Sequence, residues 1–103
     1  MNKFKTVSVS AMSALLDADG AMLLDCRRLN DYQAAHIDNA LHVHDGLVES
    51  LIKKADKAKP LLIYCYHGHA SEHLAELFAN FGFQNVYSVE GGYERWKKVQ
   101  TSA

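Results

Sequence analysis

Apolar residues are gathered along this chain into short runs, and the segments between the runs show apolar residues at every third or fourth position. Short runs with β-branched residues are typical of buried strands, whereas the wider spacing is typical of one helix face. The pattern predicts strands at residues 7–9, 21–25, 40–43, 61–65 and 85–89. It predicts a first helix that begins at Ser10, in a segment that Gly20 closes. It also predicts helices over 29–35, 46–58 and 72–81, and a last helix after Gly91-Gly92.

Residues with special backbone preferences indicate where several of these elements begin and end. Ser10 has the side chain of a helix N-cap. Pro60 cannot continue a helix, so we expect it to end the helix at 46–58 and to lead into the next strand. Gly82 follows the helix at 72–81, at the position where a left-handed residue commonly terminates a helix.

Strands that alternate with helices indicate βαβ units, and therefore an α/β fold with a parallel sheet covered on both faces. Ligands bind beyond the carboxyl ends of the strands in such sheets. Two chemically interesting segments lie at such ends, Asp25-Cys26-Arg27 and Cys65. We expect a single domain over residues 1–103, because 103 residues suffice for one core and no repeat or linker divides the chain.

Cys65 lies where a predicted buried strand ends and a short loop leads into a helix. The first N–H groups of a helix lack partners within the helix, and the helix dipole is positive there. A thiol in this position ionises more easily, and the thiolate is the nucleophilic form. The pattern therefore favours a nucleophilic Cys65, although a buried core cysteine is the structural alternative.

Composition and charge argue against several classes of partner. A formal net charge of −1 gives no electrostatic basis for binding nucleic acid or an anionic membrane. The longest apolar run is too short to span a bilayer, and the first residues show no apolar signal segment. Two cysteines do not make a disulfide framework, so a cytoplasmic location, where thiols stay reduced, is expected.

Three segments together resemble the rhodanese family of sulfurtransferases. The first resembles the family pattern D-x-R…[DE]-[FY]-x-x-G-H-I-P-G-A and comprises Leu24-Asp25-Cys26-Arg27, Asp31-Tyr32 and Ala35-His36-Ile37-Asp38-Asn39-Ala40. The second is the loop after Cys65. The third resembles V-x-x-[LV]-x-G-G-[FY]-x-x-W and runs from Val86 to Trp96. In a chain of this length, the loop Cys65-Tyr66-His67-Gly68 is most similar to the short thiosulfate sulfurtransferases of bacterial glycerol regulons.

The resemblance implies a five-stranded parallel sheet in the order 1-5-4-2-3. It also implies a thiosulfate sulfurtransferase in which Cys65 alternates between a thiolate and a persulfide and which needs no cofactor. The acceptor would be cyanide, a dithiol or a protein thiol, with a thioredoxin-like dithiol protein as one partner. Ala35, Asp38 and Asn39 replace two glycines and a proline of the family pattern, so we expect the turn there to be built differently.

Thiosulfate and its sulfite leaving group are anions, so the loop after Cys65 should offer main-chain N–H groups to negative sulfur and oxygen. The predicted substrate-binding residues are Tyr66, His67, Gly68, His69, Ala70 and Ser71. Gly68 permits a positive φ and a close approach. The Ser71 hydroxyl is expected either to cap the following helix or to donate to the persulfide.

Two residues near Cys65 have alternative interpretations. Cys26 follows two leucines in a buried strand and is expected to be a core thiol, with a resolving or regulatory partner of Cys65 as the alternative. Arg27 either pairs with Asp25 or Asp31 in a structural role or adds positive potential beside Cys65.

Three histidines, His67, His69 and His73, lie close to Cys65 in the sequence. Zinc sites usually combine two pairs of ligands at fixed spacing, and only one cysteine is near, so no metal is predicted. His67 and His69 are expected to shape the mouth of the loop or, when protonated, to favour the Cys65 thiolate.

Two other functions compete with sulfur transfer. A cysteine-loop phosphatase or arsenate reductase usually needs an arginine to clamp the dianion, but Ser71 stands where a C-x5-R loop has this arginine. A noncatalytic rhodanese-like binding module typically lacks the nucleophile, which this chain retains as Cys65.

Overall fold

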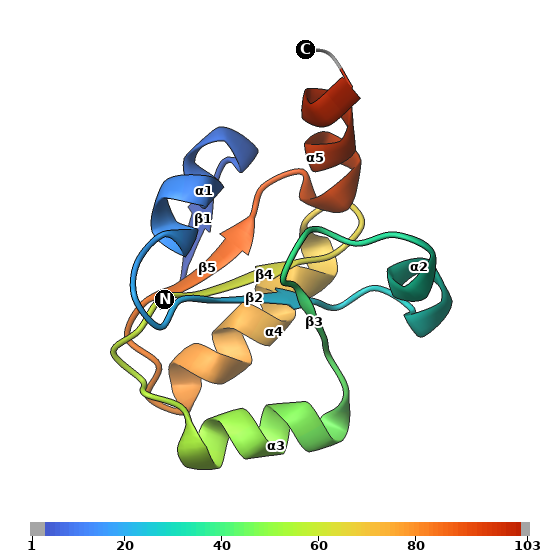
Figure 1. The fold of residues 1–103 in the computed structure, drawn as a ribbon. Coiled ribbons are helices and arrows are strands. Elements are labelled where there is room, and N and C mark those ends of the chain that lie inside the picture. The colour runs from blue at the N-terminus through green and yellow to red at the C-terminus, as the bar shows by residue number, and fades with distance from the viewer. Residues whose placement is uncertain (1–3, 102–103) are drawn as a thin grey trace.

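In the computed structural model, which describes residues 4–101, a five-stranded parallel sheet is covered by helices on both faces (Figure 1). The strands are β1 (Lys5–Val7), β2 (Met22–Asp25), β3 (Leu41–His42), β4 (Leu61–Tyr64) and β5 (Val86–Val89). The helices are α1 (Val9–Leu16), α2 (Leu29–Ala34), α3 (Asp45–Lys54), α4 (His69–Asn80) and α5 (Gly92–Thr101). The strand order β1-β5-β4-β2-β3 confirms the predicted fold class. The prediction about a signal segment also used residues 1–3, which lie outside the described residues.

Two separate apolar cores hold the sheet between its helices. The helices α1 and α5 lie over one face, and α3 and α4 lie over the other (Figure 1). Because successive side chains of a strand point to opposite faces, Leu62 and Tyr64 enter the first core while Leu61 and Ile63 enter the second. All four are fully buried, so β4 is the centre of the molecule. The same alternation directs Cys65, the next residue, toward α4.

The predicted start of the chain's first helix is wrong by two residues. The first strand covers Lys5–Val7 instead of 7–9, and Ser8, not Ser10, is the N-cap of α1. The Ser8 hydroxyl accepts a hydrogen bond from the Ala11 N–H at 3.2 Å. Two serines separated by one residue carry the same capping signal, and the sequence pattern alone did not separate them.

The predicted role of Pro60 in ending a helix is also wrong. Helix α3 ends at Lys54, and Ala55 already has an extended backbone with ψ of 150°. The Asp56 carboxylate then accepts a hydrogen bond from the Ala58 N–H at 2.9 Å. Such a short-range side-chain bond competes with the helical pattern and forms a turn before the strand. The remaining strand boundaries agree with the predictions to within one residue, and Gly82 follows α4 with φ of 97°, as predicted.

The turn before β3 accommodates both residues that replace glycines of the family pattern. Asn39, which replaces a glycine, has φ of 70° and is the one non-glycine residue with positive φ among residues 4–101. Asparagine tolerates this conformation better than most residues. Ala35, which replaces the other glycine, is extended with φ of −168°, a conformation open to any residue.

A buried ion pair joins β2 to the segment that follows it. Arg27 Nη2 lies 2.9 Å from Asp25 Oδ2, and both side chains are almost completely buried. The Tyr64 hydroxyl donates to the same carboxylate oxygen at 2.5 Å and accepts from the Ile37 N–H at 3.2 Å. Arg27 also donates to the Ala35 carbonyl at 2.6 Å. Its charge is therefore compensated by Asp25, as in the structural alternative, and not by Asp31.

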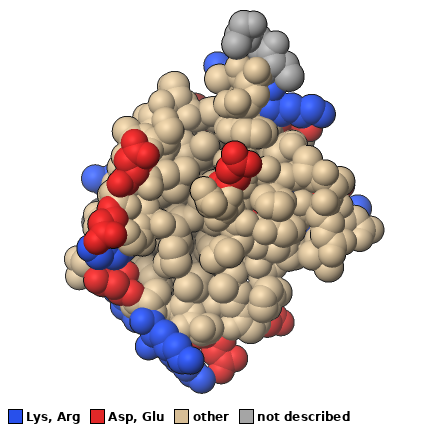
Figure 2. Space-filling view, in the orientation of Figure 1, with Lys and Arg blue, Asp and Glu red and all other residues tan. Residues whose placement is uncertain are grey.

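The outer surface carries both signs of charge. On the face shown in Figure 2, acidic and basic side chains lie mainly along the edges, and basic side chains gather at the lower left edge. None of the helices in residues 4–101 combines the length and apolar character needed to cross a bilayer.

Replacing Arg27 tests whether it is structural. Arg27→Ala should lower the free energy of unfolding by about 3–5 kcal/mol, because the Asp25 carboxylate then stays buried without its partner. The exposed neighbouring residue provides a control, and Arg28→Ala should change stability by less than about 0.5 kcal/mol. Denaturant unfolding measures both. Equal stability of the two variants would contradict a structural role for Arg27.

Candidate active site

Helix α4 begins three residues earlier than predicted, so His69, Ala70 and Ser71 belong to its first turn. Gly68 precedes the helix with φ of 107° and turns the chain from strand to helix. Ser71 is therefore not the N-cap, and its hydroxyl instead lies 2.7 Å from Ser88 Oγ in β5. The sequence pattern missed this first turn because His69 and Ala70 are exposed and give no apolar signal.

Main-chain N–H groups of the loop contact the Cys65 sulfur. The Gly68 N–H donates to Sγ at 3.0 Å and the Ser71 N–H at 3.4 Å. Within the described part of the chain, these are the two amides with a hydrogen bond to this sulfur. Cys65 is 3% exposed, yet its sulfur faces polar donors at a helix N-terminus and not only the apolar core. The arrangement suits a negatively charged sulfur.

A pair of buried serines adds a third donor. Ser71 Oγ lies 3.4 Å from Cys65 Sγ. When the thiol is ionised it can only accept, so the Ser71 hydroxyl donates to sulfur and the Ser88 hydroxyl donates to Ser71. The sequence analysis did not single out Ser88. The available signal was a polar residue on the inward side of an alternating strand, where Val86 and Ser88 are both buried.

The start of α5 donates hydrogen bonds to two main-chain carbonyls of the loop. The Tyr93 N–H donates to the Cys65 carbonyl at 2.8 Å, and the Glu94 N–H donates to the Tyr66 carbonyl at 3.2 Å. Gly92 makes this approach possible, because a Cβ there would lie 2.4 Å from the Cys65 carbonyl oxygen. Since α5 binds these two carbonyls, they do not compete with the amides around the sulfur.

The side chain of Tyr66 fastens the outer edge of the loop to the segment after β2. Its hydroxyl donates to the Asp31 carboxylate and accepts from the Arg28 N–H at 3.2 Å. Tyr66 therefore contributes to the loop through an anchored side chain as well as through its backbone.

Cys26 lies next to Cys65, at the end of the neighbouring strand β2. The β2–β4 ladder pairs Asp25 with Tyr64, and the Cys26 N–H donates to the Tyr64 carbonyl at 2.9 Å just beyond this pair. Cys26 is partly buried in the core on the α4 side, the side that Cys65 also faces. Both cysteines are free thiols. The structure thus brings together two thiols that the sequence placed 39 positions apart.

The two thiols affect each other's ionisation. A hydrogen bond with Cys26, together with those from Ser71 and Gly68, outweighs burial and lowers the pKa of Cys65 to about 4. The hydrogen bond with Cys65, with burial second, raises the pKa of Cys26. At neutral pH the pair therefore carries one negative charge, on Cys65, and one proton, on Cys26.

The histidines of the loop lie at its surface. His67 and His69 are exposed and line a pocket of about 160 Å³, together with Glu72 and Ser88. Among residues 4–101, no group of three or more histidine, cysteine or carboxylate side chains is placed to hold a metal ion. The structure therefore places His67 and His69 on the exposed side of the loop.

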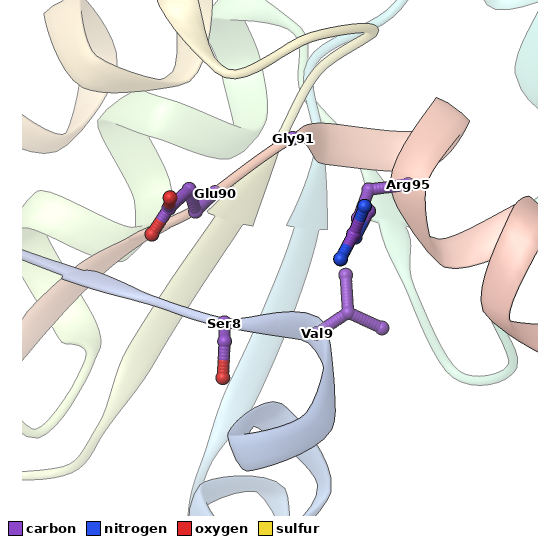
Figure 3. Close-up of a pocket in the computed structure, with 5 residues that line it drawn as sticks. All are labelled: Ser8, Val9, Glu90, Gly91 and Arg95. Atoms are coloured by element: carbon purple, nitrogen blue, oxygen red, sulfur yellow. The ribbon is translucent and has the colours of Figure 1, made fainter.

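A second pocket, of about 340 Å³, lies where β1 leads into α1 and β5 leads into α5 (Figure 3). It is lined by Ser8, Val9, Glu90, Gly91 and Arg95. The Arg95 side chain points toward Val9, while Glu90 points away from Arg95 (Figure 3). Cys65 is not part of this lining, so this pocket is separate from the sulfur site.

A cysteine loop that joins a central parallel strand to a helix, in a sheet of order 1-5-4-2-3, defines a rhodanese-like domain. Residues 8–99 match the family model of the Rhodanese-like domain, and the chain belongs to this family.

Particular relatives agree with this assignment. The chain is 40% identical over 99 residues to "Thiosulfate sulfurtransferase GlpE" of Pseudomonas entomophila, with 96% of this chain and 90% of that protein covered. Its fold is similar to the rhodanese-like domain of Anabaena protein Alr3790, with a TM-score of 0.79, 20% identity and coverage of 96% of this chain and 76% of that one. It is also similar to the human single-domain sulfurtransferase TSTD1, with a TM-score of 0.77, 21% identity and coverage of 90% and 95%.

The ionisation of Cys65 can be tested by its rate of alkylation as a function of pH. With a pKa of about 4, the rate should be flat between about pH 6 and 9 and fall only in more acidic solution. Ser71→Ala removes one donor and should raise this pKa, whereas Ser50→Ala, at an exposed position of α3, should not. A rate that rises tenfold per pH unit up to about pH 8.5 would show an ordinary thiol.

The close approach of α5 to the loop predicts a specific effect of Gly92→Ala. A Cβ there meets the Cys65 and Tyr66 carbonyls, so the variant should lose about 3 kcal/mol of stability and much of its Cys65 reactivity. Gly20→Ala is a matched control with φ of 80°, where the added atom meets only the flexible Lys59 side chain. The control should lose about 1 kcal/mol and keep its reactivity. Equal effects at both glycines would contradict the proposed contact between α5 and the loop.

Proposed function

We propose that this protein is a thiosulfate sulfurtransferase and that Cys65 carries the transferred sulfur as a persulfide. The observation that carries the proposal is the Cys65 sulfur in contact with the Gly68 and Ser71 N–H groups at the start of α4. Membership of the rhodanese-like family supports it, as does the name of the 40% identical GlpE relative. Residues 1–103 form a single domain in this proposal.

The first half of the reaction loads sulfur onto Cys65. The thiolate attacks the outer sulfur of thiosulfate, and a sulfur–sulfur bond to Sγ forms as the bond to sulfite breaks. Sulfite leaves with the electron pair of the broken bond. The negative charge moves from Sγ to the added sulfur, and the loop formed by Tyr66, His67, Gly68, His69, Ala70 and Ser71 binds the donor and the charged product with its main-chain N–H groups.

The second half passes the added sulfur to a thiophilic acceptor. A cyanide ion, a dithiol or a protein thiol attacks the outer sulfur, and Cys65 returns to the thiolate. A thioredoxin-like dithiol protein is the proposed protein acceptor, because a dithiol can take the sulfane sulfur from the persulfide by thiol–disulfide exchange chemistry. The cycle needs Cys65 as a thiol, so we propose a reducing cytoplasm as its location.

The arrangement of charges disfavours phosphate chemistry. Ser71, at the sixth position after Cys65, donates to sulfur and offers no cation. The neighbouring arginine, Arg27, is buried and paired with Asp25. A phosphoryl dianion would therefore lack the bidentate clamp that stabilises its transition state. The retained nucleophile likewise disfavours a noncatalytic binding module.

Intact mass after incubation with thiosulfate tests the proposal. The protein should gain one sulfur, about 32 Da, on Cys65 and lose it again on addition of cyanide, with formation of thiocyanate. Cys65→Ser should gain no sulfur and form no thiocyanate while unfolding at a similar temperature. Thiocyanate formation by the Cys65→Ser variant, or turnover of a phosphate ester instead, would refute the proposal.

A further inference from the structure

Cys26 is a second thiol beside Cys65, at the end of the neighbouring strand. We propose that Cys26 attacks Sγ of the Cys65 persulfide, forms a Cys26–Cys65 disulfide and releases the outer sulfur as hydrosulfide. The inference rests on the proposed function and identifies what happens to the sulfur when no external acceptor is present.

The register of the sheet brings the two cysteines to a distance that a disulfide can span. Cys26 and Cys65 are the residues that directly follow the register pair Asp25 and Tyr64. Neighbouring strands lie about 4.8 Å apart. Disulfides join residues whose Cα atoms are about 4.4–6.8 Å apart, so this pair needs little backbone movement. A disulfide also requires that the two side chains point the same way, and both lie on the α4 side of the sheet.

The neighbours of Sγ are distributed so that attack and departure occur from different sides. In the sheet, β4 lies between β2 and β5. Ser71 contacts Ser88 of β5, whereas Cys26 extends β2 on the opposite side of β4. A displacement at sulfur requires the incoming and leaving sulfur atoms to lie in line. An outer sulfur held by the loop amides leaves the β2 side of Sγ open to Cys26.

The atoms and electrons of this step balance without an added oxidant. The Cys65 persulfide anion and the Cys26 thiol become a disulfide and HS⁻, and the proton of Cys26 leaves on the departing sulfur. The two cysteines are oxidised and the sulfane sulfur is reduced by two electrons. Reset requires an external dithiol, the acceptor class already proposed, which exchanges with the Cys26–Cys65 disulfide. Cyanide takes the outer sulfur directly and so competes with Cys26.

The roles of the two thiols follow from where the proton resides. Before loading, Cys65 carries the charge and is the nucleophile toward thiosulfate, while Cys26 keeps its proton. After loading, the charge has moved to the outer sulfur, so Sγ becomes electrophilic and no longer repels a developing Cys26 thiolate. In the first step Cys65 is therefore the nucleophile and Cys26 its hydrogen-bond donor. In the later step Sγ of Cys65 is the electrophile and Cys26 is the attacking thiol.

The experiment is anaerobic incubation of the reduced protein with thiosulfate alone, followed by intact mass and by an assay for free sulfide. The wild type should first gain about 32 Da and then fall to about 2 Da below its reduced mass, with one sulfide released per chain. Peptide mapping should find the Cys26–Cys65 linkage. A parallel incubation without thiosulfate should leave the reduced mass in place.

The Cys26→Ser and Cys26→Ala variants should load one sulfur at the end point, whatever their rates, and should hold it without releasing sulfide. Thermal unfolding of both variants verifies that they are folded. A wild-type protein that loads sulfur and keeps it, or Cys26 variants that release sulfide as the wild type does, would overturn the inference alone. A wild type that neither gains sulfur nor releases sulfide, together with Cys26 variants that gain no sulfur, would overturn the proposed function and the inference with it.

Discussion

The contact between the Cys65 sulfur and the first turn of α4 is the interaction that the rest of the site depends on. Two amides and a hydroxyl reach the sulfur because the chain turns from β4 into α4 within four residues, the last of which is the left-handed Gly68. The turn stays in place because β4 is buried by both cores and because α5 binds the Cys65 and Tyr66 carbonyls. The donors are thus fixed before any anion arrives, which is the condition for electrostatic stabilisation at low cost.

The site stabilises negative charge with neutral donors instead of with cations. The loop after Cys65 contains no lysine or arginine. Arg27, the arginine next to Cys26, is held by Asp25, and its guanidinium packs 3.8 Å from the centre of the Tyr93 ring. Amides and hydroxyls suit a single diffuse charge on sulfur that moves outward by one atom during the reaction. They suit a compact phosphoryl dianion poorly, and this difference separates sulfur transfer from phosphate chemistry on a similar loop.

The sequence predicted those features that depend on periodicity and on short motifs. The central strand at residues 61–65, the cysteine loop and the helix after it follow from apolar spacing, and the strand order follows from the family resemblance. What it did not predict depends on contacts between distant residues. Ser88 became part of the site only through its position opposite Ser71. Which of Ser8 and Ser10 caps the first helix depends on where the backbone leaves β1. The choice between Asp25 and Asp31 for Arg27 likewise required the folded chain.

In the proposed reaction, an added sulfur on Cys65 is received by the main-chain N–H groups of its loop. The most direct measurement is a crystal structure of the Cys26→Ser protein after treatment with thiosulfate, since this variant cannot form the internal disulfide. We expect one extra sulfur bonded to Sγ of Cys65 and within hydrogen-bond distance of N–H groups between Tyr66 and Ser71. An unmodified Cys65, or an extra sulfur that points away from these amides, would contradict it.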